Sequence, residues 1–158
     1  MINNFIIRKA EGKDLKKVQQ LNHELFLHDA ECDPTLHMNW PFEKAGEEYF
    51  LSRINEVSGV CYVAEIEGEV IGYVCGAIKS PHTARTITKI VELENILVKE
   101  GLRGNNIGEK LCEAIFAWGK LQGAERATVS AFTDNKEAIR FYERIGYAPY
   151  DLTLEREL

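Results

Sequence analysis

Apolar residues recur along the chain in two different rhythms, and their order predicts a chain that mixes helices with strands. Apolar residues spaced three or four positions apart predict helices, whereas alternating apolar and polar residues predict strands. The Glu67-Gly68-Glu69 segment between two alternating runs predicts a hairpin. In chain order, the expected elements are strand 5–8, helix 14–27, helix 43–55, strand 60–66, strand 70–79, strand 88–99, helix 106–122, strand 126–131, helix 136–144 and one or two terminal strands over 147–157.

Composition narrows the class of protein. The chain has 158 residues, which suits one domain, and a net charge of −6, which argues against nucleic acid as the main partner. No apolar run is long enough to span a membrane, and the N-terminus is too short and polar for a signal peptide. The four cysteines form no C-x-x-C pair, so we expect free thiols in a protein of the cytoplasm.

The most informative segment is a polar turn between the strand expected over 88–99 and the helix that follows. It reads Arg103-Gly104-Asn105-Asn106-Ile107-Gly108. The first N–H groups of a helix lack partners within the helix, and the helix dipole places partial positive charge there. Gly and Asn tolerate the left-handed angles that curl several N–H groups around one anion, and Arg103 adds a cation. The turn therefore predicts a site for a pyrophosphate group.

Two common phosphate-binding motifs fit this turn poorly. A Walker loop needs Lys followed by Ser or Thr, but here Lys110 is followed by Leu111. A dinucleotide fingerprint needs G-x-G-x-x-G after the first strand of a βαβ unit, whereas this turn lies about two-thirds of the way along the chain. The turn instead resembles R-x-x-G-x-G, the pyrophosphate signature of the GNAT superfamily of coenzyme A-dependent N-acyltransferases. Arg103 and Gly108 match this signature, and Asn106 stands where the pattern usually has Gly or Ala.

A second stretch carries the same resemblance. Residues 135–147 are similar to the GNAT pattern N-x-x-A-x-x-F-Y-x-x-x-G-F/Y, with Asn135, Phe141 and Tyr142 in matching positions. The same residues also suit an ordinary amphipathic helix capped by Asp134 or Asn135. Because both stretches occur in the right order and spacing, the chain resembles this superfamily over about residues 3–157 and is closest in pattern to small-amine and polyamine acetyltransferases.

The resemblance implies the GNAT fold, which is of the α/β (α+β) class. A central mixed, mostly antiparallel sheet of about six to seven strands would be flanked by about four helices. It also implies that residues 1–158 form a single N-acetyltransferase domain. The implied enzyme is an acyltransferase that moves an acetyl group from acetyl-CoA to a primary amine by direct attack in a ternary complex. The alternative is a non-catalytic acyl-CoA-binding sensor or regulatory domain, and an unrelated nucleotide-binding protein would prefer ATP or NAD.

The resemblance assigns residues to the cofactor. The N–H groups of the turn would hold the pyrophosphate, and the preceding strand would pair with the pantetheine arm as with an added strand. An N–H of Val98 or a neighbour would face the thioester oxygen. The side chain of Asn135 would contact pantetheine, unless it only caps its helix. The cofactor-binding residues implied in this way are Ile96, Leu97, Val98, Arg103, Gly104, Asn105, Asn106, Ile107, Gly108, Asn135 and Tyr142.

Two catalytic residues follow from the same resemblance. Tyr142 matches the residue that protonates the leaving thiolate in many GNAT enzymes, although a buried structural tyrosine is the alternative. Glu94 lies four residues before Val98, at the place of an acidic residue in polyamine acetyltransferases, and is the candidate base. Glu92 is two positions earlier and so lies on the same strand face. Glu92 and a water relay remain open alternatives for the base.

The acceptor amine stays open between a polyamine, an amino acid, an aminoglycoside and a protein N-terminus. The stretch from Glu24 to Trp40 carries clustered carboxylates and an aromatic ring, which suit an ammonium group but also an ordinary solvated loop. The histidines in this stretch lack the spacing of a helical metal pair, so we expect no metal. Many relatives dimerise through terminal strands or a sheet edge, and residues 152–158 alternate in polarity, so we expect a homodimer.

Overall fold

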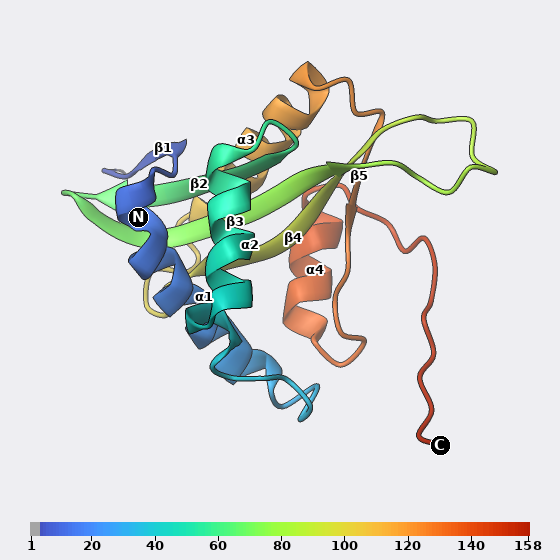
Figure 1. Cartoon of the computed structure of the whole chain (residues 1–158), viewed down its shortest axis with the longest axis horizontal. Helices are drawn as coiled ribbons and strands as arrows, with labels where there is room; N and C mark the ends of the chain where they lie inside the picture. Colours follow the sequence, from blue (N-terminus) through green and yellow to red (C-terminus); the bar gives the residue numbers. More distant parts are fainter. Residues whose placement is uncertain (1–3) are drawn as a thin grey trace.

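The computed structural model describes residues 4–158, and most of their regular structure lies where the sequence predicts it (Figure 1). Two short 3₁₀ helices, labelled η, accompany the main elements. The elements are β1 (Ile6–Lys9), η1 (Gly12–Asp14), α1 (Leu15–Asp29), η2 (Trp40–Phe42), α2 (Lys44–Asn55), β2 (Gly59–Ile66), β3 (Glu69–Lys79), β4 (Ile90–Val98), α3 (Ile107–Leu121), β5 (Arg126–Val129) and α4 (Lys136–Arg144).

The strands form one sheet in the order β1-β2-β3-β4-β5. Neighbours from β1 to β4 are antiparallel, and β5 runs parallel to β4. The hairpin between β2 and β3 turns through Glu67 and Gly68, whose φ angles of 50° and 84° suit a two-residue turn. The expected α/β (α+β) class, with a mixed and mostly antiparallel sheet, is confirmed.

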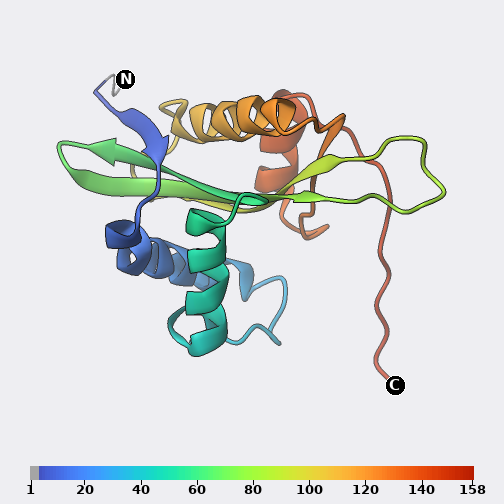
Figure 2. The ribbon, with the colours of Figure 1, turned by 45° about the horizontal axis from the view of Figure 1, so that its top comes forward.

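Helices cover both faces of the sheet, as Figure 2 shows. The face covered by α1 and α2 is called the α2 face, and the face covered by α3 and α4 is called the α3 face. On the α2 face, Leu21 and Phe50 are fully buried in one apolar cluster with Tyr73. On the α3 face, Leu111 and Ile115 are fully buried in a second cluster. This two-sided burial explains why β2 and β3 are apolar over most of their length.

Helix α3 approaches β4 very closely. At Gly119 an added Cβ atom would lie 2.7 Å from Cγ1 and 2.8 Å from Cβ of Val91. A methyl group does not fit at such distances, so the absence of a side chain at Gly119 lets the helix lie directly on the strand. The close packing fixes the helix whose first turn carries the predicted pyrophosphate site.

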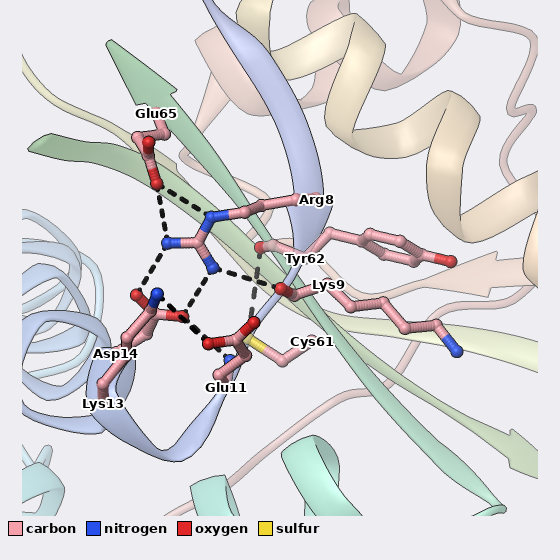
Figure 3. A network of polar contacts seen from close by, with 8 residues as sticks. All are labelled: Arg8, Lys9, Glu11, Lys13, Asp14, Cys61, Tyr62 and Glu65. Atoms are coloured by element: carbon pink, nitrogen blue, oxygen red, sulfur yellow. Dashed lines mark hydrogen bonds and ion pairs between the residues drawn. The ribbon is translucent and has the colours of Figure 1, made fainter. Parts of the chain in front are cut away.

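A partly buried cluster of ion pairs joins β1 and η1 to β2 (Figure 3). Arg8 on β1 donates two hydrogen bonds to the carboxylate of Asp14, at 2.7 and 2.9 Å, and one to Glu65 on β2, at 2.8 Å. Asp14 also accepts a hydrogen bond from the N–H of Glu11, which completes a capping box at η1. The Arg8 guanidinium outweighs the effect of burial and lowers the pKa of Asp14.

The expected terminal strands are the one part of the fold prediction that is wrong. Residues 147–158 have no regular secondary structure, so the sheet of the described chain has five strands rather than six or seven. The alternation that suggested strands is real, but Tyr150, Leu152 and Leu154 are 71%, 67% and 84% exposed. An alternating segment becomes a strand only when it pairs with an edge, and this segment leaves the sheet (Figure 2).

No helix among residues 4–158 has both the length and the apolar character needed to cross a lipid bilayer.

Candidate active site

The site begins where β4 and β5 separate. Their parallel pairing covers Ile90 to Leu93 on β4 and ends at the Leu93–Val129 pair. In the described chain, no strand pairs with residues 94–98 on that side, so the second half of β4 has an open edge. An open edge within a sheet offers unpaired N–H and C=O groups to an extended ligand.

The register shows which residues present main-chain groups to the open edge. The N–H of Lys99 donates to the carbonyl of Ile71 at 2.9 Å, which makes Gly72 and Val98 a non-hydrogen-bonded pair. The main-chain groups of Val98, and those of Ile96 two residues earlier, therefore point away from β3 and toward the open edge. Leu97 alternates with them, so its main-chain groups face Tyr73 on β3.

The turn after β4 has the backbone conformation that the sequence predicts. Gly104 and Asn106 have φ angles of 80° and 62°, and Asn106 directly precedes α3. In the described chain, the Asn106 side chain makes no capping hydrogen bond to α3, so it does not cover the first N–H groups of the helix. The Nδ2 atom of Asn105 donates to the carbonyl of Leu102 at 3.0 Å. Ile107 is buried beneath the turn.

Arg103 ties the turn to the open edge. Its Nε atom donates to the carbonyl of Val98 at 3.3 Å, and its Nη1 atom lies 4.0 Å from a carboxylate oxygen of Glu137 on α4. The side chain is 41% exposed, so the guanidinium lies at the surface between β4, the turn and α4. A cation in that place neutralises the charge of a nearby phosphate group.

Helix α4 closes the other side of the opening. A Cβ atom at Gly108 would lie 3.4 Å from the Phe141 ring and 3.9 Å from Cγ2 of Val98, so α3, α4 and β4 meet at this point. Asn135 caps α4, because its Oδ1 atom accepts a hydrogen bond of 3.1 Å from the N–H of Ala138. Of the two predicted caps, Asn135 is therefore the one that the structure uses.

Tyr142 lies on the inner side of α4. Its ring contacts the rings of Phe141 and Tyr147, with centroids 5.3 and 5.7 Å away. Burial raises the pKa of the Tyr142 phenol, and the neighbouring Cys112 and Asp29 raise it further. The phenol therefore keeps its proton at neutral and moderately alkaline pH. We find no hydrogen bond from its hydroxyl to any residue of the described chain, which leaves this donor available to a ligand.

A β-bulge in β4 arranges the acidic residues. Gly76 on β3 pairs with Leu93 and the preceding Cys75 pairs with Asn95, so Glu94 is an extra residue without a partner. A bulge interrupts the alternation of side chains along a strand. Consequently Glu94 and Asn95 both contact Tyr49 on the α2 face, although they are adjacent in sequence. Glu92 and Glu94 share this face, as the sequence predicts.

Glu94 is held by α2. The guanidinium of Arg53 donates to both oxygens of the Glu94 carboxylate, at 2.5 and 2.7 Å, and the Tyr49 hydroxyl donates to one of them at 2.7 Å. The side chains of Arg53 and Glu94 are only 15% and 14% exposed. Burial alone would raise the pKa of Glu94, but the bonds from Arg53 and Tyr49 outweigh it and lower the pKa below its usual value.

Lys79 on β3 covers the solvent side of the two carboxylates. Its Nζ atom lies 3.2 Å from Oε1 of Glu94 and 3.7 Å from Oε2 of Glu92. Lys79 and Glu92 are 40% and 37% exposed, whereas Glu94 is mostly buried. The Lys79 ammonium group is therefore the cation that another group can replace, whereas the Arg53 guanidinium is held in place.

Aromatic rings continue from this cluster toward α1. Trp40 stacks on Phe26 with ring centroids 5.9 Å apart and contacts the Tyr49 ring at 5.5 Å. The carboxylates of the 31–41 loop are less well placed. Asp33 accepts hydrogen bonds from Thr35, and the His37 ring pairs with Glu43 at the surface. The aromatic part of the predicted acceptor region thus lies near Glu94, but much of its acidic part forms local surface contacts.

Sequence reasoning did not identify Tyr49, Arg53 and Lys79 as site residues. Arg53 is 41 residues from Glu94 along the chain, and only the packing of α2 on the sheet brings the two together. An ordinary amphipathic helix carries no signal that would single out one of its arginines. The sequence gives no signal for the bulge either, because positions 94 and 95 carry neither the Gly nor the Pro that would suggest one.

A family model shows the family of this chain, and a curated relative and solved structures are similar to it. The family model described as the acetyltransferase (GNAT) family matches residues 16–147. An N-alpha-acetyltransferase of Sulfurisphaera tokodaii is 28% identical over 148 residues, which cover 90% of this chain and 80% of that protein. A variant of the BH1408 protein from Bacillus halodurans superposes with a TM-score of 0.85 at 23% identity, covering 97% and 99% of the two chains. The aminoglycoside acetyltransferase AAC(6')-Iy, in a complex with a CoA bisubstrate analogue, superposes with a TM-score of 0.78 at 16% identity over 99% of each chain.

The chain belongs to the acetyltransferase (GNAT) family. It is an acyltransferase enzyme whose cosubstrate is acetyl-CoA.

Proposed function

We propose that the protein transfers the acetyl group of acetyl-CoA to a primary amine by direct attack in a ternary complex. The observation that carries this proposal is the open edge of β4, which lies between the turn at residues 103–108 and helix α4. A thioester-bearing chain that pairs with this edge has its pyrophosphate end at the turn and its acyl end near Glu94. The acceptor then approaches from the α2 face.

We assign the binding of the cofactor mostly to main-chain groups. The N–H groups from Arg103 to Gly108 hold the pyrophosphate, and the side chain of Arg103 supports it. The main-chain groups of Ile96 and Val98 pair with the pantetheine arm, since the register directs them to the open edge. At the acyl end of the arm, the N–H of Ile96, the open-edge residue nearer Glu94, stabilises negative charge on the thioester oxygen. Asn135 orients the same arm while it caps α4.

The proposed transfer step is a direct displacement at the acetyl carbon. The amine loses one proton, and its nitrogen then attacks the acetyl carbon. The carbon–nitrogen bond forms, the carbon–sulfur bond breaks, and the sulfur leaves with the bonding electron pair. Tyr142 donates its proton to that sulfur, and the nitrogen releases a second proton that restores the phenol through solvent. One proton is left over, which passes to the medium.

We assign the base role to Glu94 acting through a water molecule. Both carboxylate oxygens of Glu94 are already bonded to Arg53, so direct contact with the acceptor nitrogen is restricted. Its lowered pKa keeps it anionic at neutral pH, which favours an ammonium group nearby but makes it a weak base, so the amine proton passes through the water molecule to solvent. Glu92 is more exposed and accepts only the longer contact from Lys79, which makes it the weaker candidate.

The acceptor class that the site favours is a small cationic amine or a chain terminus. Two carboxylates with an adjacent Tyr49 and Trp40 surface suit an ammonium group. The relative from Sulfurisphaera tokodaii is named an N-alpha-acetyltransferase, and AAC(6')-Iy is named an aminoglycoside acetyltransferase. A first screen should therefore include a peptide with a free α-amino group, an aminoglycoside and spermidine.

Calorimetric titration of the protein with acetyl-CoA, with ATP and NAD as controls, tests the cofactor assignment. We expect selective binding of acetyl-CoA at micromolar concentration. Turnover in the amine screen is measured with both substrates varied. Double-reciprocal plots of initial rate that intersect support a ternary complex, whereas parallel plots would contradict direct attack. Binding of acetyl-CoA without turnover of any amine would support a non-catalytic acyl-CoA sensor instead.

We also propose a homodimer located in the cytoplasm. The tail after α4 is extended and exposes Leu152 and Leu154, while the outer edge of β5 has no strand beside it in the described chain. Strand addition between two copies would cover both features. The four cysteines form no disulfide, which suits a reducing compartment.

A further inference from the structure

Helix α2 contacts the bulge of β4 through the side chains of Arg53 and Tyr49. We propose that Arg53 is a positioning residue for the acetyl transfer, because it fixes the orientation and the ionised state of Glu94 at the β4 bulge. The inference rests on the proposed function, in which Glu94 faces the acceptor.

The geometry separates this pair from an ordinary surface salt bridge. Arg53 uses two nitrogens on the two oxygens of one carboxylate, and both side chains are about 85% buried. Planar two-point contacts of this kind fix orientation as well as charge. The guanidinium is itself fixed, since it lies 4.7 Å above the Tyr49 ring and donates to the Ser52 hydroxyl at 2.8 Å.

The place of the pair along β4 gives it a role at the site. Glu94 is the first residue beyond the β4–β5 pairing, so it lies where the sheet opens. As a bulged residue it has no paired partner on β3 to hold its direction. A carboxylate on such a residue needs an external support to keep one orientation, and Arg53 with Tyr49 provides it from α2.

The charged surroundings of Glu94 come from three elements. Tyr49 and Arg53 face it from α2, Lys79 and the Cys75 thiol from β3, and Glu92 lies beside it on β4 and shares Lys79. Arg53 is the cation among these with the shortest contacts and the least exposure. Loss of Arg53 therefore leaves burial as the dominant influence and raises the pKa of Glu94.

The test compares Arg53→Met, Arg53→Lys and the surface control Lys44→Met, which removes an exposed cation of the same helix. In wild-type protein with ¹³C-labelled glutamate carboxyl groups, the Glu94 signal, identified by its loss in Glu94→Gln, should titrate below the usual pH range. Arg53→Met should move this titration to higher pH, Arg53→Lys should restore part of the shift, and Lys44→Met should leave it unmoved. An unmoved Glu94 titration in folded Arg53→Met protein overturns the proposal.

Kinetics with an amine found in the screen supply the second readout. Arg53→Met should lower kcat/KM for the amine by about tenfold or more and move the acid limb of its pH profile upward, with the Kd of acetyl-CoA unchanged. The double variant Arg53→Met/Glu94→Gln removes both charges, so it should fold and be no slower than Glu94→Gln alone. Additive losses, or lower thermal stability with an unmoved profile, would assign Arg53 a structural role only. Failure of wild-type protein to bind acetyl-CoA would instead overturn the proposed function, and this inference with it.

Discussion

At the residue scale, Tyr142 offers the sharpest test of the chemistry. Its hydroxyl has no hydrogen-bond partner in the described chain, and its raised pKa keeps it protonated where amines begin to lose their protons. Tyr142→Phe should therefore lower kcat by about a hundredfold, because the departing sulfur loses its proton donor. The Kd of acetyl-CoA, measured by calorimetry, should stay within about twofold because one hydroxyl among many contacts is removed.

Tyr147→Phe is the matched control for this change. The Tyr147 ring contacts the Tyr142 ring, and its hydroxyl is buried without a partner in the described chain. Removing that hydroxyl should leave kcat nearly unchanged and should not destabilise the protein, since no hydrogen bond is lost. Equal values of kcat in the two variants would remove Tyr142 from the mechanism.

Single residues also mark where prediction from sequence ends. The left-handed Asn106 and the capping Asn135 follow from local chemistry, because Asn suits both positions whatever lies far away in sequence. The support of Glu94 by Arg53 does not, because it depends on a bulge and on the packing of α2. The candidate base was thus found from its motif, whereas its surroundings were not.

At the scale of elements, the contact between α3 and β4 depends on Gly119. In Gly119→Ala the new methyl would lie 2.7 Å from Val91, and such overpacking costs about 1–3 kcal/mol, against about 1 kcal/mol of helix propensity gained. We expect a net loss of about 1 kcal/mol in the free energy of unfolding, measured by urea denaturation. Gly108→Ala is the control, since its methyl would make ordinary contacts of 3.4 Å; a stabilised Gly119→Ala protein would contradict the close approach.

The link between β1, η1 and β2 should depend on pH. Asp14→Asn removes one of the two carboxylates that pair with Arg8 and should cost about 2 kcal/mol at pH 7, because the guanidinium keeps Glu65 but loses its charged hydrogen bonds to Asp14. The pKa of Asp14 is lowered in the folded protein, so its stabilisation is complete above the unfolded pKa of about 3.9 and is lost as the pH falls through the folded value.

Denaturant titrations of wild type and Asp14→Asn across pH 3 to 7 measure this difference. The two free energies of unfolding should converge at the acid end. Lys13→Met, which breaks only the exposed contact with Glu11, should change stability by less than about 0.5 kcal/mol at any pH. A constant gap between wild type and Asp14→Asn would show that the Asp14 charge is not its cause.

At the scale of the whole molecule, the proposed homodimer depends on the tail at residues 147–158. Leu152→Asn/Leu154→Asn should convert a dimer to a monomer in size-exclusion chromatography with light scattering, because polar residues weaken an added strand at the β5 edge. Leu121→Asn, at an 85% exposed leucine on α3, should leave the dimer intact. A wild-type monomer at micromolar concentration would contradict the proposed assembly.

The fold as a whole was easier to predict from the sequence than the C-terminal tail. The boundaries of the internal strands and helices follow from alternation and helical spacing, because both faces of the sheet are covered within the chain. The tail shows the same alternation, yet no strand of the described chain lies beside it. The periodicity of a sequence indicates which side chains are suited to burial. It does not indicate whether the same chain or a second chain buries them.

The open edge of β4 has a consequence for how long the protein survives. Within residues 4–158, no strand lies beside residues 94–98 on one side, so in the proposed complex an extended ligand completes the sheet there. A ligand that binds only the folded state stabilises it by about 2.7 kcal/mol at one hundred times its Kd. Thermal denaturation and proteolysis should both slow when acetyl-CoA is abundant. The cosubstrate would then act as a sixth strand, and the lifetime of the enzyme would follow the acetyl-CoA supply of its surroundings.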